Sequence, residues 1–301
     1  DNLIHDAEMG ELESDGFSSG VFDDRWAFTS FSSTLNFGSI AALAAASRAL
    51  KGYNDELAHE SLQIAAKAWA EEQSREPIIF SHGNTTGGPL PVEQVNAALE
   101  LLVATGERKY ADEFLQHLPE IAAMFPHLAV QAVRGMPHMD ESYREKIRQL
   151  TLAYRGQMDD ASRGNPFGVV ITEGGWAGNG SIIDTAIAHY YLHTAFPDII
   201  REEDVLKGLN YILGTHPDSD LSFVSGVGTR SKQVAYGMNR ADFSFIAGGV
   251  VPGVLILKPD FPENKEDWPF LWGENEYVIN VAAAYIFLAN AARELVSNTA
   301  D

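Results

Sequence analysis

The sequence predicts an all-α fold, and three observations support this prediction. Apolar residues recur at helical spacing along most of the chain, in segments separated by turns. Short β-like runs occur only at 78–81, 169–172 and 250–257. Strands and helices do not alternate as a parallel sheet requires. The paired helices favour hairpins arranged in a ring, an (α/α) barrel, as readily as a solenoid.

The first helix is expected at residues 34–50, which are rich in alanine and end before Gly52. The third begins with Pro91 and ends before Gly106, which are typical helix start and stop residues. Loops are expected at 77–90, 164–180 and 214–272. The last loop is rich in aromatic residues, so we expect it to be ordered and to form part of a site. The other helices are expected at 55–72, 91–105, 107–116, 119–134, 140–154, 181–194, 202–213 and 276–296.

The composition indicates a globular protein with a strong negative charge. Apolar residues make up 45% of the 301 residues, which excludes disorder as a description of the whole chain. The 42 acidic and 21 basic residues give a net charge of −21. This charge argues against nucleic acid or an anionic membrane as a partner, and no membrane insertion is expected. The absence of cysteine excludes disulfides, a thiolate nucleophile and a Cys-ligated metal.

The segment 272–280 (WGENEYVIN) carries the most chemical information. It places Glu276 where a loop becomes a helix, and the helix dipole stabilises an anion there. Trp272, Asn275 and Tyr277 flank this acid, and aromatic faces beside a carboxyl group are typical of a sugar site. An apolar wall can also raise the pKa of a glutamate until it donates a proton near neutral pH. The alternative is that Glu274 and Glu276 are ordinary charges at a helix start.

Several segments together resemble a known family. Residues 211–214 (YILG) and 222–228 (SFVSGVG) are similar to the YLLG…SYVTGFG signature of glycoside hydrolase family 9. Residues 275–282 (NEYVINVA) resemble its NEVAIDYNA segment. The segments 34–69, 99–110 and 175–181 resemble its helix pair, its AAELYKATGDSKY segment and its WGSN loop. The resemblance runs in order through nearly the whole chain.

The resemblance implies an (α/α)6 barrel and inverting hydrolysis of β-linked gluco-oligosaccharides or polysaccharides. A β-1,4 linkage is expected in particular. Glu276 holds the position of the family's general acid. The general base lies in an Asp-Ala-Gly-Asp motif of the family, which does not occur here. The only adjacent aspartates are Asp23-Asp24 and Asp159-Asp160, and we expect both pairs in solvated turns.

A ring of six hairpins needs twelve helices, and the pattern indicates about nine. We therefore expect residues 1–301 to form a single catalytic domain that is the C-terminal part of an incomplete barrel. An upstream segment of the same protein would then carry the base aspartate.

Further residues are expected around the sugar. Arg240 follows a segment, YGMN, in which Met and Asn replace histidines of the family's HPHHR element. This departure leaves exo action open. The alternative for Arg240 is a surface pair with Asp242. Trp176, Trp272 and Tyr277 could each stack on a sugar ring or anchor a loop in the core, whereas Trp69 is expected in the core.

No cofactor is expected. His189 and His193 are spaced like a metal-binding pair but lack further ligands. The family's calcium element matches residues 88–93, where only Glu93 offers a carboxylate, so we expect this site to be lost. The rival functions are a non-catalytic carbohydrate-binding barrel and a lyase acting on uronic acids. A protein acting on such sugars is expected outside the cytoplasm, either periplasmic or secreted.

Overall fold

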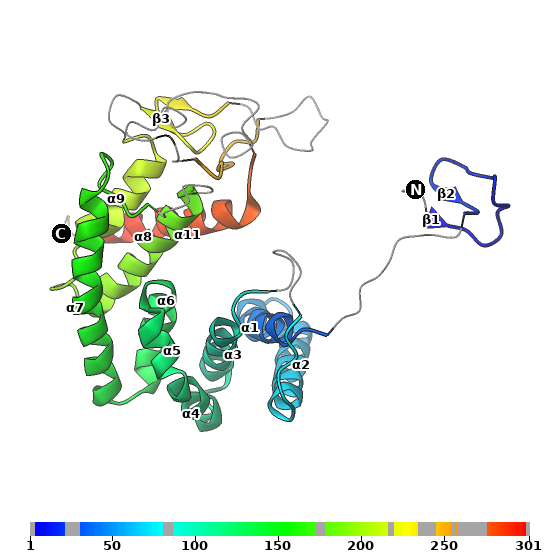
Figure 1. Ribbon diagram of the computed structural model, residues 1–301, viewed down its shortest axis with the longest axis horizontal. Coiled ribbons are helices and arrows are strands. Elements are labelled where there is room, and N and C mark those ends of the chain that lie inside the picture. The colour runs from blue at the N-terminus through cyan, green and yellow to red at the C-terminus, as the bar shows by residue number, and fades with distance from the viewer. Residues whose placement is uncertain are drawn as a thin grey trace.

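A computed structural model describes residues 4–21, 31–80, 87–171, 178–215, 220–233, 245–254, 257 and 276–298. These residues are mainly helical, which confirms the predicted fold class (Figure 1). The α-helices are α1 (Ser33–Leu50), α2 (Asp55–Gln73), α3 (Leu90–Thr105), α4 (Arg108–Gln116), α5 (Leu118–Ala123), α6 (Phe125–Gly135), α7 (Glu141–Arg163), α8 (Gly178–Ala195), α9 (Glu202–Ile212) and α11 (Ile279–Asn298).

The short strands that the structure describes lie outside the three β-like runs of the sequence. Two short parallel pairs form, β1 (Ile4–His5) with β2 (Ser18–Ser19) and β3 (Leu221–Ser222) with β4 (Arg230–Ser231). Within the described residues, the three β-like runs contribute no strand, and Val250 makes a single bridge to Val224. Their apolar residues are explained by burial instead, since Val169, Val250 and Val251 lie in a core between helices.

The helices form an arc of two layers (Figure 1). α1, α3, α6, α8 and α11 pack against one another in this order as an inner layer. α2, α4, α7 and α9 each pack against the preceding inner helix. Because an outer helix returns the chain after each of these inner helices, we infer that the inner helices run in the same direction. Their first residues therefore lie at one end of the arc, which we call the mouth: Ser33, Leu90, Phe125, Gly178 and Ile279.

Two apolar clusters hold the arc together, and both include residues of α8. One contains Phe37, Trp69 and Tyr110, whose rings meet edge to face, so Trp69 lies in the core as predicted. The other joins α8, α9 and α11 with the segments around Phe223 and Val250. Burial of this apolar surface is the main source of stability for helices that would be marginal alone.

Polar side chains also connect the inner helices. Glu100 of α3 accepts hydrogen bonds of 2.5 Å from Arg48 of α1 and from Arg134 of α6. One turn earlier on α3, Asn96 accepts from Gln131 of α6 at 2.8 Å. These contacts fix the relative positions of α1, α3 and α6.

Most helix boundaries agree with the sequence prediction, with two corrections before α8. The helix expected at 119–134 is two helices, because Pro126 lacks an N–H and disfavours helical backbone before it. The helix expected at 140–154 continues to Arg163. Arg155 explains this extension, since it binds Asp159 on α7 and Asp204 on α9. Asp159 and Asp160 consequently lie in a helix and not in the predicted turn.

The last helix begins at Ile279, later than predicted. Residues 276–278 are not helical, because Val278 donates its N–H to the Val250 carbonyl at 3.3 Å and is thereby held beside the 245–254 segment. Within the described residues, Ile279–Ser297 is the one helical stretch long and apolar enough to cross a membrane, judged by length and composition only.

The two end helices of the arc expose apolar side chains. On α11, Ile279, Ile286 and Phe287 are 88%, 61% and 41% exposed. On α1, Leu35 is 43% exposed. Within the described residues, these helices are the two inner-layer members that have an inner neighbour on one side only.

Candidate functional site

The hydroxyl of Tyr277 is held by hydrogen bonds whose donors and acceptors can be assigned. The Ser225 hydroxyl donates to the Lys232 carbonyl at 2.6 Å and therefore accepts from the Tyr277 hydroxyl at 2.8 Å. The Tyr277 oxygen in turn accepts from the N–H of Ile246 at 3.1 Å. The hydroxyl thus joins three separate segments of the chain at one point.

The ring of Tyr277 lies directly against Gly249. A Cβ at Gly249 would come within 2.6 Å of the ring, so only glycine permits this approach. The backbone around Gly249 is itself fixed, because Ser225 donates its N–H to the Gly249 carbonyl and accepts from the N–H of Gly248. Tyr277 is therefore fixed by both its ring and its hydroxyl.

These contacts determine where Glu276 lies. It directly precedes Tyr277, is half-buried, and stands three residues before α11. Tyr277 and Val278 are both bonded to the 245–254 segment, so the backbone of Glu276 has little freedom. Glu276 is accordingly placed at the mouth, beside the N-terminal end of α11.

The same loop segment also locks the start of α8. Asn179 is fully buried. It donates its side-chain N–H to the Val251 carbonyl and its backbone N–H to the Pro252 carbonyl, both at 2.9 Å. Gly253, with a φ of +76°, packs so closely on Asn179 that a Cβ there would lie 2.5 Å from it. The ends of α8 and α11 are thereby joined through one loop.

A cavity of about 570 Å³ opens at the mouth between α6, α7 and α8. This volume lies within the range of about 300–1,000 Å³ found for small-molecule sites. We call this cavity the mouth cavity. The polar side chains that line it can both donate and accept hydrogen bonds. These polar residues are His127, Gln131, Tyr154, Gln157, Ser181, Asp184 and Thr185.

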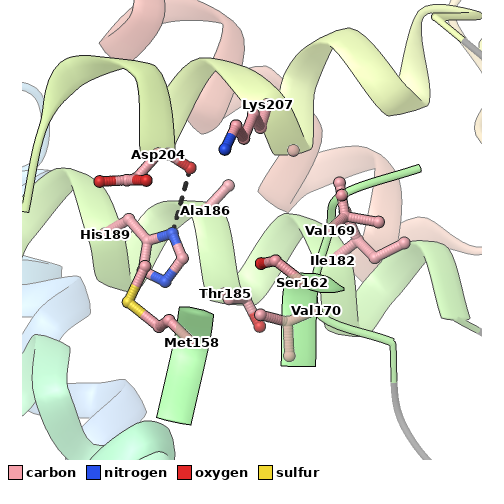
Figure 2. Close-up of a pocket in the computed structure, with 12 residues that line it drawn as sticks. Met158, Ser162, Val169, Val170, Ile182, Thr185, Ala186, His189, Asp204 and Lys207 are labelled. Carbon is pink, nitrogen blue, oxygen red and sulfur yellow. Dashed lines mark hydrogen bonds between the residues drawn. The ribbon is translucent and has the colours of Figure 1, made fainter. Parts of the chain in front are cut away.

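A second cavity, between α7, α8 and α9, is too small for a sugar (Figure 2). Its volume of about 20 Å³ corresponds to roughly one water molecule. His189 lines it and donates from Nδ1 to the Asp204 carbonyl at 3.1 Å, so Nε2 accepts from the Tyr154 hydroxyl at 3.0 Å. Burial lowers the pKa of His189, and burial beside Asp204 raises the pKa of Tyr154 to about 12. This cluster joins three helices and has a structural role.

The structure describes two of the six residues that the sequence placed in the site. Glu276 and Tyr277 lie together at the mouth. Arg240, Trp176, Asn275 and Trp272 lie outside the described residues. The Tyr277 hydroxyl is used within the protein, so the predicted sugar contact would have to use its ring. The sugar contacts of all these residues stay predictions.

The candidate metal ligands make protein contacts. His193, like His189, bonds a backbone carbonyl through Nδ1, that of Ile200 at 2.8 Å. Glu93 accepts from the N–H of Gly88 at 3.1 Å. Across the described ranges, no group of three or more His, Asp or Glu side chains is arranged to hold a metal ion.

Sequence reasoning missed Ser225, Asn179 and Asp184. The first two lie in segments that carried the family resemblance, yet a motif does not reveal which distant backbone its side chains will bond. Asp184 occurs in an apolar helix, and an acidic residue within such a run was an available signal.

Comparison with known proteins identifies the family and the fold. A search of curated proteins found no match. The family model described as Glycosyl hydrolase family 9 matches residues 22–289. A Bacteroides ovatus GH9 structure is similar with a TM-score of 0.67 and 21% identity, over 88% of this chain and 54% of that one.

Two other solved structures agree. AaCel9A in complex with a cellobiose-like isofagomine gives a TM-score of 0.69 with 18% identity, covering 87% of this chain and 56% of that one. The cellulase Cel9M of C. cellulolyticum gives 0.67 with 16% identity, covering 89% and 65%. The arc is thus part of an (α/α)6 barrel, and the chain spans about half the length of the solved structures it matches first. The chain belongs to glycosyl hydrolase family 9.

Proposed function

We propose that this chain supplies the general-acid half of an inverting β-glycosidase that acts on β-linked gluco-oligosaccharides or polysaccharides. The observation that carries this proposal is the placement of Glu276. Its backbone is fixed through Tyr277 at the mouth, the end at which the mouth cavity opens. Solved structures described as a family 9 endoglucanase, a cellulase and a complex with a cellobiose-like isofagomine support a sugar substrate.

In the proposed reaction, Glu276 protonates the glycosidic oxygen while the bond to the anomeric carbon breaks. A second carboxylate removes a proton from the water that attacks the opposite face of the sugar. Inversion requires roughly 6.5–9.5 Å between the two carboxyl groups, which leaves room for this water. Products would therefore carry the α configuration at the new reducing end.

We propose that the second carboxylate is an aspartate on a further segment that packs between α1 and α11. These helices end the inner layer, and they expose Leu35 on one side and Ile286 and Phe287 on the other. An apolar helical segment of the same protein that covered these side chains would close the ring. Arg240, Trp176, Asn275 and Trp272 are proposed to surround the sugar, with the protein acting outside the cytoplasm.

The test is hydrolysis of cello-oligosaccharides by a protein that includes the ring-closing segment. Glu276→Gln keeps the shape of the side chain but removes its acidic proton, so we expect a rate loss of at least about 100-fold. Glu294→Gln, on the exposed part of α11 where Glu294 accepts from Tyr190, is the matched control and should leave the rate unchanged. Equal activity of Glu276→Gln and wild type would refute the assignment of the acid. Sugar binding without any hydrolysis would favour a non-catalytic carbohydrate-binding barrel.

A further inference from the structure

The mouth cavity contains one acidic side chain among its described lining residues, Asp184. Asp184 lies in the second turn of α8, and its side chain is exposed to the cavity. The same cavity is lined by the neutral side chains of Gln131, Gln157 and Thr185 and by the ring of His127. The electrostatic character of this cavity therefore depends mainly on Asp184.

Three buried or half-buried carboxylates in the helical body have partners that explain their presence. Glu100 binds two arginines, Asp204 binds Arg155, and Glu72 binds Arg75 and Asn36. Asp184 makes no ion pair or hydrogen bond within the part of the chain that the structure describes. Its charge is not used to hold the fold there.

The surroundings of Asp184 affect its pKa in the opposite direction from those of Glu72 and Glu100. Partial desolvation in the cavity wall raises the pKa of Asp184. For Glu100, burial alone would raise the pKa, but hydrogen bonds from Arg134 and Arg48 lower it overall. A partly desolvated carboxylate that has no partner in the protein gains from a ligand that brings a positive charge or hydrogen-bond donors.

We propose that Asp184 selects the charge of the sugar that occupies the mouth cavity. Sugars with an amino group bind best, neutral sugars bind less well, and uronates are rejected. This inference rests on the proposed function, because it assumes that the cavity is part of the sugar site. It adds a specificity-determining residue, and it disfavours a lyase acting on uronic acids, whose substrate would place a carboxylate beside Asp184.

The size of the effect follows from the exposure of the site. An ion pair between partly exposed groups contributes up to about 1 kcal/mol, which corresponds to roughly fivefold in affinity. We therefore expect each step from amino sugar to neutral sugar to uronate to weaken binding by about fivefold at low salt. The differences should shrink as the Debye length falls from about 10 Å at 0.1 M to about 3 Å at 1 M ionic strength.

The experiment is titration calorimetry of the 301-residue protein with three β-1,4-linked tetrasaccharides, made of glucosamine, glucose and glucuronate. It is run at about pH 6, where an ordinary aspartate is ionised. Asp184→Asn should bind the three sugars with equal affinity, whereas Asp184→Glu should keep the order of preference. Asp112→Asn is the control for net charge, since Asp112 is an exposed residue of α4. Thermal unfolding of each variant verifies that it is folded.

The outcomes separate this inference from the proposed function. The predicted order in wild type, lost in Asp184→Asn and kept in Asp112→Asn, supports both. Binding of all three sugars with the same order in wild type and Asp184→Asn overturns the role of Asp184 but leaves a sugar site. Equal binding of the three sugars by wild type also overturns it. No binding of any sugar contradicts the proposed site.

Discussion

The Tyr277 hydroxyl donates a hydrogen bond to the Ser225 hydroxyl across 2.8 Å, although 52 residues separate them in the chain. Ser225 follows the SFV segment after α9, and Tyr277 follows the proposed acid. This contact connects the two segments that carry the strongest family motifs. It explains how a loop that is not helical presents Glu276 in a fixed position.

Removing the Tyr277 hydroxyl should destabilise the contacts that hold Glu276 in place at the mouth. Tyr277→Phe leaves the ring on Gly249 but takes the partner from Ser225 and Ile246, so we expect a loss of about 1 kcal/mol in the free energy of unfolding. In a protein that includes the ring-closing helical segment, kcat should fall while KM changes little, because only the placement of Glu276 is disturbed. Tyr285→Phe on α11 is the control, since Tyr285 has no hydrogen-bond partner among the described residues. Equal effects of the two variants would contradict a positioning role.

The ring contact of Tyr277 can be tested independently at Gly249. Gly249→Ala would place a Cβ 2.6 Å from the ring, and we expect a destabilisation of about 2 kcal/mol from overpacking. Gly156→Ala is the comparison, because Gly156 lies inside α7 with open space around it. There the added methyl group should stabilise the helix by up to about 1 kcal/mol. Urea unfolding measures both changes, and a neutral Gly249→Ala would show that the ring does not need this approach.

The His189 cluster predicts a specific dependence of stability on pH. Its folded pKa is lowered, chiefly by burial and also by Arg155 and Lys207, while the Asp204 carbonyl and carboxylate act in the other direction. The folded state therefore favours the neutral ring. Stability from this group is complete above the unfolded pKa of about 6.5 and is lost as the pH falls toward the folded pKa.

The variant that isolates this effect is His189→Asn, whose amide can still donate to the Asp204 carbonyl. Between about pH 5 and 8, the free energy of unfolding of wild type should fall more steeply toward acid than that of the variant. His193→Asn, which likewise removes a histidine that bonds a backbone carbonyl, is the comparison variant. Parallel curves for wild type and His189→Asn would contradict the lowered pKa.

Glu100 should be important for the relative placement of the inner helices. Its side chain is 13% exposed and binds Arg48 and Arg134, so Glu100→Gln removes the charge opposite two arginines. Because both arginines retain some contact with water, we expect a loss of about 2 kcal/mol, below the range for fully buried pairs. Asp112→Asn, which weakens only an exposed pair with Arg108, should cost less than about 0.5 kcal/mol. Denaturant unfolding that gave the same small loss for both would contradict this view.

The sequence predicted the helices well because their patterns are local. Pro91 in the first turn and Gly106 after the last residue mark the two ends of α3. The start of α11 was predicted too early, because the Tyr277 hydroxyl and the Val278 N–H bond to distant loop segments, and the first helical hydrogen bond is the one that the Val278 carbonyl accepts from Ala282. Pro126 was a local signal for the break between α5 and α6, but the apolar spacing continues across it and favoured a single helix.

The candidate site was predictable only in part. Glu276 could be identified because its motif is contiguous. Ser225 and Asn179 donate hydrogen bonds to backbone carbonyls that become their neighbours only after folding. Asp184 is a candidate site residue only because three helices form a cavity around it. Pairwise spacing in the sequence contains no such information. Tertiary packing determines these contacts.

The most direct test of the central claim is the configuration of the first product. Proton NMR can follow hydrolysis of a β-linked cello-oligosaccharide by the protein with its ring-closing segment, alongside Glu276→Gln. The account predicts that the α-anomer appears first with wild type and that the variant forms no product on the same timescale. Initial release of the β-anomer, or unchanged hydrolysis by Glu276→Gln, would contradict an inverting reaction with Glu276 as its acid.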